Sequence, residues 1–348
     1  MKRMARVVMA AAMVAVPVSA QEVQRVAGSD VAIYNLAGRV EVVGGGGSEV
    51  VVRITRGGAG AAELTVETGQ IGGRSTLRIV YPDDEIIYPA MGRGSNTSFS
   101  VRADGTFGDG RGDNGDRMRI RGSGRGVEAW ADLVIEVPAG ITASVYLAAG
   151  EMEARRVEAA LRLDTGSGGI TATEVSGSLD IDTGSGAVSV RGIEGSLRVD
   201  TGSGRVQVSD VVGDEIELES GSGGISGSGL EAQALRVDTG SGSVQLLDVT
   251  SPRVVVDTGS GSVEIELLED VELLEVDTGS GSVTVRAPDD LGATVEIDTG
   301  SGDIDLDFPL EVRSVRRDRV QGRLGDGEGT MRIDTGSGSI RIVRRGAI

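Results

Sequence analysis

The chain has 348 residues, of which 56 are glycine and only eight are aromatic (four Tyr, three Phe, one Trp), so a thick aromatic core is not expected. Its net charge of −19, from 53 acidic and 34 basic residues, disfavours nucleic acid and anionic lipid as partners. Cysteine and histidine are absent and the single lysine is Lys2, which removes the usual general bases, soft metal ligands and Schiff-base formers.

The N-terminus has the pattern of a secretory signal peptide. Three basic residues precede an apolar run over residues 7–16, and Val-Ser-Ala ending at Ala20 forms a small-residue cleavage site. The run is shorter than the roughly 20 residues that a membrane helix needs. Removal of residues 1–20 takes the charge from −19 to −22, because three basic residues leave. We expect the mature chain in the periplasm, the cell envelope or the extracellular space, without a transmembrane segment or lipid anchor.

Residues 21–140 are expected to form an N-terminal β region with an irregular insertion over residues 83–128. With its borders the insertion holds five of the eight aromatic residues, interleaved with arginine, as in many binding hot spots. One interpretation is a ligand-binding loop, and the other is a cover whose aromatic rings pack on the flank of the fold. The candidate ligand-binding residues are Tyr88, Arg93, Phe99, Phe107, Arg111, Asp113 and Trp130.

The stretch GDGRGDNGD inside the insertion allows two sharper hypotheses. Arg111-Gly112-Asp113 is an integrin-type tripeptide, although three residues recur often by chance. Asp109, Asp113 and Asp116 could ligate calcium, but their spacing does not fit an EF-hand loop. We therefore expect no metal site and no cofactor, with calcium kept as an alternative.

Residues 141–348 contain nine copies of one signature, an acidic residue followed by Thr-Gly-Ser-Gly or Ser-Gly-Ser-Gly. The acidic residues are Asp164, Asp182, Asp200, Glu219, Asp238, Asp257, Asp277, Asp298 and Asp334. Successive copies are 18 to 21 residues apart, except that the last step of 36 residues is taken as two periods with one degenerate copy. A fixed period of this kind indicates stacked structural units.

The columns of the aligned copies predict two short strands per unit. One residue before and six residues after each acidic residue the side chain is always aliphatic, and the positions between are polar. This alternation is typical of strands with one buried face, and a unit of 18 residues can bury that face only by stacking on its neighbours. The fold class expected is therefore an all-β, parallel β-solenoid of 18–21-residue coils. The same cadence recurs in residues 144–154 and 33–44, so the solenoid should begin soon after residue 21.

The acidic residues are interpreted as structural, forming a ladder at the turns. An Asp that faces outward before a tight corner can accept hydrogen bonds from turn amides, and glycine tolerates backbone angles that other residues resist. The threonines that follow should point inward. Two positions before the acidic residue, the charge alternates in sign over the first five copies, as stacking in register would favour.

Three further segments are also typical of one protein family: YNLAGRVEVVGGGGSEVVVRITR, ADLVIEVPAGITASVYLAAGEM and GRLGDGEGTMRIDTGSGSIRIV. With the DTGSG coils, they make the chain similar to a bacterial adhesin-like family of β-strand repeats, a domain family of unknown function akin to auto-transporter adhesin head domains. The resemblance implies a β-solenoid of the envelope or the extracellular space. It brings no catalytic residues.

The leading functional hypothesis is an exported, non-enzymatic scaffold that binds an envelope or extracellular ligand, with polysaccharide as one candidate. It follows from the absence of a catalytic constellation and from regular exposed ladders. An alternative is a polysaccharide-acting β-helix enzyme, which would need paired carboxylates in an aromatic-lined groove. A second alternative is an envelope protein stabilised by calcium on the acidic ladder.

Overall fold

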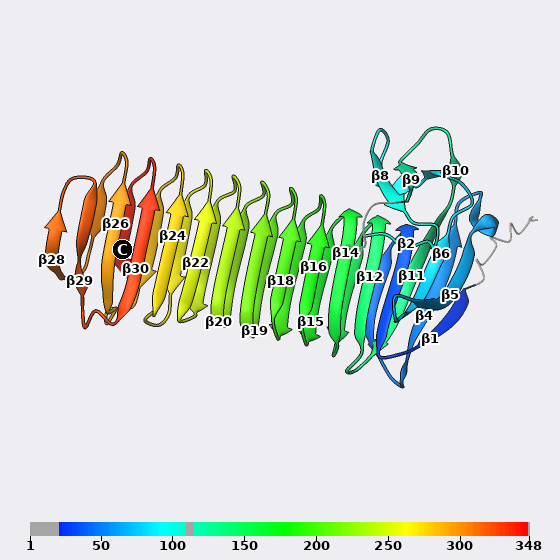
Figure 1. Cartoon of the computed structure of the whole chain (residues 1–348), viewed down its shortest axis with the longest axis horizontal. Helices are drawn as coiled ribbons and strands as arrows, with labels where there is room; N and C mark the ends of the chain where they lie inside the picture. Colours follow the sequence, from blue (N-terminus) through cyan, green and yellow to red (C-terminus); the bar gives the residue numbers. More distant parts are fainter. Residues whose placement is uncertain (1–20, 109–114, 347–348) are drawn as a thin grey trace, which may run out of the picture.

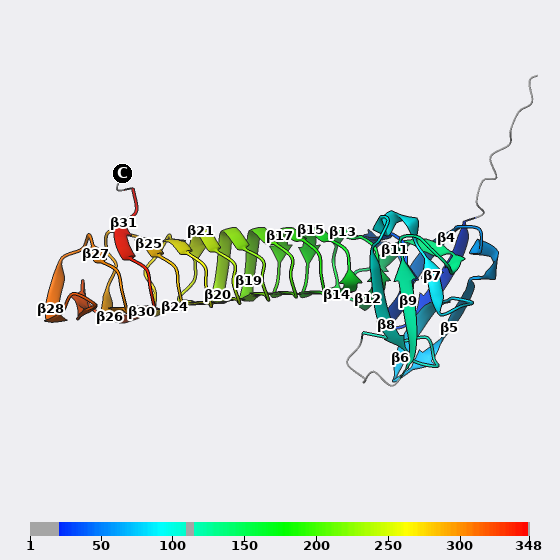
Figure 2. The same ribbon diagram turned by 90° about the horizontal axis from the view of Figure 1, so that it is seen from above.

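The computed structural model describes residues 21–108 and 115–346 and shows an all-β chain whose strands stack along one long axis (Figure 1). Viewed at right angles, the stack has two layers of strands (Figure 2). Helical structure in the described residues is limited to the single turns η1 (Ala61–Glu63) and η2 (Pro89–Met91). None of these described helices has the length and hydropathy to cross a membrane. The expected signal peptide lies outside the described residues.

One layer, here called the ladder sheet, contains the strands that end in the acidic signature. In order along the axis it consists of β2 (Asp30–Ala37), β12 (Thr142–Ala149), β14 (Ala160–Ser167), β16 (Leu179–Thr183), β18 (Leu197–Thr201), the second halves of β19 (Val206–Ser220) and β20 (Ile225–Thr239), β22 (Arg253–Thr258), β24 (Leu273–Thr278), β30 (Gly329–Thr335) and β26 (Ala293–Thr299). All of these neighbours are parallel, as a β-solenoid requires.

The opposite sheet repeats this order with the strands that follow each turn. It consists of β3 (Val40–Gly45), β13 (Met152–Val157), β15 (Ile170–Ser176), β17 (Val188–Glu194), the first halves of β19 and β20, β21 (Val244–Thr250), β23 (Val263–Leu267), β25 (Val283–Ala287), β31 (Ile340–Arg344) and β27 (Ile304–Leu306). The predicted strand–turn–strand unit is therefore present in each coil.

The core lies between the two sheets and is as thin as the composition indicates. The aliphatic residue before each ladder acid is buried in all nine coils, as at Leu163 and Ile181. The residue six places after the acid is buried in eight coils, and only Ile304 near the C-terminal end is half-buried. Each such side chain contributes about 1.5–3 kcal/mol, so the stack is stabilised by many equal increments rather than by one large core.

The glycines of the TGSG turn are required by close approach between coils. A side chain on Gly186 or Gly242 would overlap the backbone carbonyl of Gly168 or Gly223 in the preceding coil. A Cβ on Gly184 would lie 2.7 Å from the carbonyl oxygen of Gly166. Among the turn glycines only Gly168, in the first coil of the signature, has a positive φ, of 138°. The expectation that these turns need unusual backbone angles therefore holds for the first turn and is wrong for the others, where glycine is needed because the coils approach closely.

The hydroxyl residue of each signature, Thr or Ser220, is buried, as predicted, and in every signature except that of Thr165 it joins one coil to the next. The Thr258 hydroxyl donates to the carbonyl of Gly242 at 3.0 Å, and Ser220 makes the same bond to Gly204 at 3.1 Å. The Thr239 hydroxyl also accepts a hydrogen bond from the amide of Gly242 within its own turn. Among the described residues no turn amide donates to a ladder carboxylate. The hydroxyl, not the acid, therefore caps the turn, which corrects the predicted role of Asp.

The last repeat does not take the last place in the stack. β30 pairs with β24 on one side and with β26 on the other, and β31 lies in the same way between β25 and β27. The 36-residue interval holds no further coil. It contains an antiparallel hairpin, β28 (Leu310–Val315) and β29 (Arg319–Leu324), which pairs with β26 and ends the sheet (Figures 1 and 2). The prediction of a degenerate coil was wrong because this segment lacks the glycine pair that lets one coil approach the next.

The charges on the ladder sheet agree with this order. Two positions before the acids, the register places Arg332 between Glu275 and Glu296. The sequence order would have put the two glutamates side by side, and like charges on neighbouring strands are destabilising. The alternation of sign therefore resumes at the C-terminal end of the stack.

The N-terminal end is closed by strands that leave the solenoid after its first coil. β2 and β3 stack directly on β12 and β13, so residues 30–45 form a coil, as their cadence indicated, and this coil is adjacent to residues 142–157. The chain between them builds a cover from β1 (Glu22–Ala27), β4 (Glu49–Gly57), β5 (Thr65–Ile71), β6 (Arg74–Val80) and β11 (Trp130–Pro138). β6 and β11 extend the two layers in parallel, and the other strands pair with this group antiparallel.

The segment 83–128 is not irregular as expected. Its described part forms a separate four-stranded sheet, here called the small sheet, in the order β10 (Val127–Glu128), β7 (Glu85–Ile87), β9 (Asp116–Arg121) and β8 (Asn96–Val101). Its strands are short, and buried Ile86 and Ile120 anchor it to the core. The small sheet projects beside the N-terminal coils (Figure 1).

We predict that cysteine pairs will report the order of the C-terminal coils. Glu275→Cys with Arg332→Cys should form a disulfide, because neighbouring parallel strands lie about 4.8 Å apart. Glu275→Cys with Glu296→Cys should not, since two strand spacings exceed the roughly 7 Å reach of the bond. The natural chain has no cysteine, so mass spectrometry after mild oxidation gives a clean result. Cross-linking of 275 to 296 alone would contradict the inserted position of β30.

We also predict that Thr258→Val lowers the free energy of unfolding by about 1–2 kcal/mol, because the Gly242 carbonyl loses its donor. Thr258→Ser should retain stability, as Ser220 does this in the natural chain. Thr165→Val is the matched control, since the buried Thr165 hydroxyl has no hydrogen-bond partner among the described residues. Denaturant titration of the three variants measures the difference, and equal losses for Thr258→Val and Thr165→Val would exclude the proposed bond.

Candidate functional site

The nine acidic residues form one continuous line on the ladder sheet. In their spatial order they are Asp164, Asp182, Asp200, Glu219, Asp238, Asp257, Asp277, Asp334 and Asp298, each paired in register with the next. Neighbours in such a line are about 4.8 Å apart, so the ladder concentrates negative charge along one edge of the sheet.

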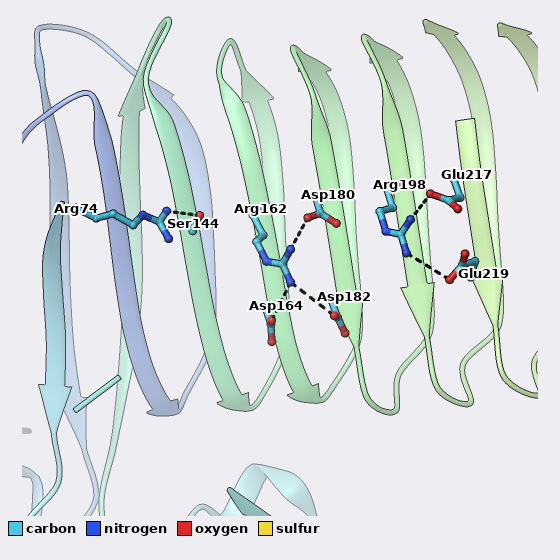
Figure 3. A network of polar contacts seen from close by, with 9 residues as sticks. All are labelled: Arg74, Ser144, Arg162, Asp164, Asp180, Asp182, Arg198, Glu217 and Glu219. Atoms are coloured by element: carbon cyan, nitrogen blue, oxygen red, sulfur yellow. Dashed lines mark hydrogen bonds and ion pairs between the residues drawn. The ribbon is translucent and has the colours of Figure 1, made fainter. Parts of the chain in front are cut away.

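Arginines in the adjacent column offset part of this repulsion (Figure 3). The Arg162 guanidinium lies 2.5 Å from Asp180, 3.4 Å from Asp164 and 3.7 Å from Asp182. Arg198 likewise pairs with Glu217 and lies 3.4 Å from Glu219. One guanidinium thus serves acids from two coils, which gives the outer face an electrostatic as well as a hydrogen-bonded link between coils.

Both ends of the ladder are closed by side chains that are not acidic. At the N-terminal end the same column continues from Asp164 to Tyr146, Tyr34 and Arg78. At the other end Asp298 pairs in register with Arg319, whose guanidinium lies 3.5 Å away. The exposed row of like charges is therefore bounded by rings on one side and by a cation on the other.

Burial makes Asp164 the most perturbed member of the ladder. Desolvation raises its pKa to about 7, the charge of Asp182 adds to the rise, and Arg162 opposes it. Only 15 % of its side chain is exposed, and Gly108 and the ring of Tyr146 lie against it. Desolvation also raises the pKa of Asp182 and Asp277, followed in each case by the charge of a neighbouring ladder acid.

The aromatic candidates of the insertion pack in two groups. Phe107 meets the edge of Tyr34 at 5.8 Å, and Tyr34 stacks on Tyr146 at 4.7 Å. Phe99 lies 6.2 Å from Phe107, and its ring occupies the space that a side chain on Gly166 would need. These rings fix the small sheet to the first coils and cover the end of the ladder. This placement matches the structural-cover interpretation for Phe99 and Phe107.

The remaining candidates are dispersed. Tyr88 packs against Trp130 at 5.9 Å, and Trp130 lies over Gly57 on the neighbouring strand. Arg93 is exposed between η2 and β8. Arg111 and Asp113 lie outside the described residues, together with the tripeptide that contains them. The structure therefore does not bring the predicted set together as one ligand-binding site.

A different group of polar residues faces outward from the small sheet. Arg117, Arg119 and Arg121 alternate with Met118 and Ile120 on β9, so the arginines share one face. They lie opposite Ser100, Ser98 and Asn96 of β8. We call these six residues the arginine face. Glu85 on β7 lies 3.2 Å from Arg119 and 3.6 Å from Arg121.

Two hollows adjoin the arginine face. The first, of about 500 Å³, is lined by Arg117, Arg119 and Arg121 with small polar residues. The second, of about 740 Å³, lies between the small sheet and the first coils, and its walls include Arg39, Tyr88, Glu151 and Ser185. Gly94, Ser95 and Asn96 line both hollows, so the two lie side by side.

Two further hollows lie on the solenoid. The first has a volume of about 720 Å³ and runs along the axis of the stack. It is lined by Glu174, Asp210 and Asp248, at bends near the ends of the opposite-sheet strands where these residues adopt left-handed backbone conformations. A second, of about 340 Å³, lies on the outer surface of the opposite sheet over neutral Ser189, Gln207 and Ser226. Across the part of the chain that the structure describes, no three Asp or Glu side chains are grouped as a metal site.

The arginine face was missed because the insertion was judged irregular. Its signal is the alternation in DRMRIR, residues 116–121, where arginine and apolar residues have the period of a strand. The sequence around Ser98 and Asn96 has no such alternation. These two residues belong to the face only because β8 pairs with β9. Arg39 and Glu151 belong to different coils and meet at 3.0 Å only through stacking.

The raised pKa of Asp164 predicts that stability decreases as pH rises. Its folded pKa of about 7 exceeds the ordinary value of 3.8, so the folded state binds the proton more tightly between these values. We expect Asp164→Asn to raise the free energy of unfolding by about 2 kcal/mol at pH 8 and by much less at pH 5. The same substitution at exposed Asp257 should change it little. Thermal unfolding at both pH values tests this, and a gain of equal size at pH 5 would contradict it.

Comparison with known proteins identifies a family segment. Residues 194–343 match the family model described as Toastrack DUF4097, a domain of unknown function. No curated protein matches the chain. A crystal structure from Clostridium sporogenes, described as a "putative cell adhesion protein", is 10 % identical and covers 94 % of this chain and 99 % of its own, with a TM-score of 0.19 too low to support any inference. Over residues 194–343, the repeat region of this chain is therefore similar to the Toastrack DUF4097 family.

Proposed function

We propose that this chain is an exported, non-enzymatic scaffold that binds an envelope or extracellular ligand, with polysaccharide as the ligand class. In this proposal the small sheet and the adjoining coils form a binding head, and the repeats form its mount. The observation that carries the proposal is the pair of adjacent polar hollows at one end of the stack. Their walls come from the small sheet and from the turn glycines of the first coils.

Rigid attachment of the head supports this proposal. The rings of Phe99 and Phe107 hold the small sheet against Tyr34 and Tyr146, so the hollow between the two parts keeps its shape. A preformed hollow loses less conformational entropy when it binds a ligand than a mobile loop does. Serine, asparagine and arginine side chains in its walls can hydrogen-bond to sugar hydroxyls.

We predict that purified residues 21–348 will be retained by at least one of three preparations: cell walls, outer-membrane fractions or a glycan array. A variant with Ser189→Asp, Gln207→Glu and Ser226→Asp alters the neutral outer surface of the opposite sheet and should bind as well as the natural chain, because the head is untouched. Binding is measured by pull-down and array fluorescence. The same incubations are assayed for new reducing ends, which a scaffold does not produce.

Three outcomes would contradict the proposal. Absence of binding to every preparation would remove the binding function. Loss of binding in the opposite-sheet variant would move the site from the head to the repeats. Release of reducing ends by the natural chain would replace the scaffold with an enzyme.

A further inference from the structure

The arginine face is a cationic surface on a strongly acidic protein. Three guanidinium groups line the first hollow, and its described lining contains no acid; Glu85 pairs with two of them from the neighbouring strand. Arg117 is exposed and has no ion pair among the described residues. By contrast, Arg162 and Arg198 of the ladder sheet each contact two or more acids. The arginine face therefore has donor capacity that the protein itself does not use.

Its residues suit an anionic group on a hydroxyl-rich polymer. Alternate residues of a strand are about 6.7 Å apart, so the arginines offer charge at regular intervals along one line. Serine or asparagine lies opposite each arginine and can bond to neutral hydroxyls. The lining of the first hollow contains no aromatic ring and no aliphatic side chain among its described residues. It thus lacks a platform for stacking bases and an apolar wedge for entering lipid.

We propose that the arginine face binds an acidic polysaccharide through the carboxylate or sulfate groups of successive sugar units. This inference rests on the proposed function and specifies its ligand class and its site. Guanidinium groups bind such anions through paired, charge-assisted hydrogen bonds. The second hollow adjoins this surface at Ser95 and Asn96, and its walls offer further polar groups, among them Ser185 and the Arg39–Glu151 ion pair.

The acidic repeats do not prevent this binding at physiological salt. Charges separated by more than about 8 Å are largely screened there, so a bound polymer senses mainly the residues that it contacts. The small sheet projects beside the N-terminal coils, at the opposite end of the stack from β28 and β29 (Figure 1). Glu85 has a positioning role, because it holds Arg119 and Arg121 side by side while it neutralises one charge.

The test uses a fluorescent octamer of galacturonic acid and its uncharged galactose counterpart, with anisotropy measured in 0.15 M NaCl. Residues 21–348 should bind the acidic octamer in preference to the neutral one. Arg117→Ser with Arg119→Ser should weaken binding at least tenfold, and Glu85→Gln should tighten it severalfold. The matched control is Arg205→Ser with Arg253→Ser, which removes one unpaired and one paired arginine from the repeats and should change nothing.

The outcomes separate this inference from the proposed function. If the natural chain binds cell walls or other glycans but the Arg117→Ser/Arg119→Ser variant, with an unchanged melting temperature, binds the acidic octamer equally well, only the inference fails. No binding of the octamer by the natural chain also overturns it. Tighter, arginine-dependent binding to phosphatidylglycerol vesicles or to a single-stranded oligonucleotide would assign the surface to another class of partner. No binding to any preparation would refute both proposals.

Discussion

The fold depends on the contact between the TGSG turns of successive coils. Each turn places backbone carbonyls where the next turn has only glycine, so the coils approach more closely than side chains would allow. That approach brings the Thr258 hydroxyl within reach of the preceding coil, and the same bond recurs along the stack. With the corner fixed in this way, the strands on both sides stay in register, and their alternate residues must face the core or solvent together.

The ladder of acids is a consequence of this register. The residue just before the corner points away from the core, and the equivalent residues of successive coils lie one strand spacing apart. When that residue is acidic in every coil, the charges form a line. Arginines at Arg162 and Arg198 reduce the resulting repulsion locally, and Tyr146 and Arg319 end the row. The carboxylate nearest the rings, Asp164, is the most desolvated and has the most strongly raised pKa. The acids therefore occupy a position that the register leaves exposed to solvent. The turn is stabilised by the neighbouring hydroxyl and not by the acid.

The sequence predicts those parts of the molecule that repeat. The columns of aliphatic residues identify the strands and the core, and their cadence identifies residues 33–44 and 144–154 as parts of coils. The order of the C-terminal coils was missed, although Glu275, Glu296 and Arg332 contained a signal: two like charges would adjoin in sequence order, and the observed order separates them. The small sheet could not be recognised from strands of two to six residues, because its pairings join segments whose own patterns are too short to identify.

The end of the acidic ladder also lies next to the proposed binding head. Where the column changes from Asp164 to Tyr146, the rings of the insertion cover the sheet, and the small sheet beside them carries the arginine face. A repeat region bearing carboxylates on its ladder repels an acidic polymer, and the arginine face attracts it. Like-charge repulsion along the mount thus disfavours non-productive binding, as discrimination between partners often requires. Segregation of charge would confine an acidic ligand to the head without any change in the shape of the coils.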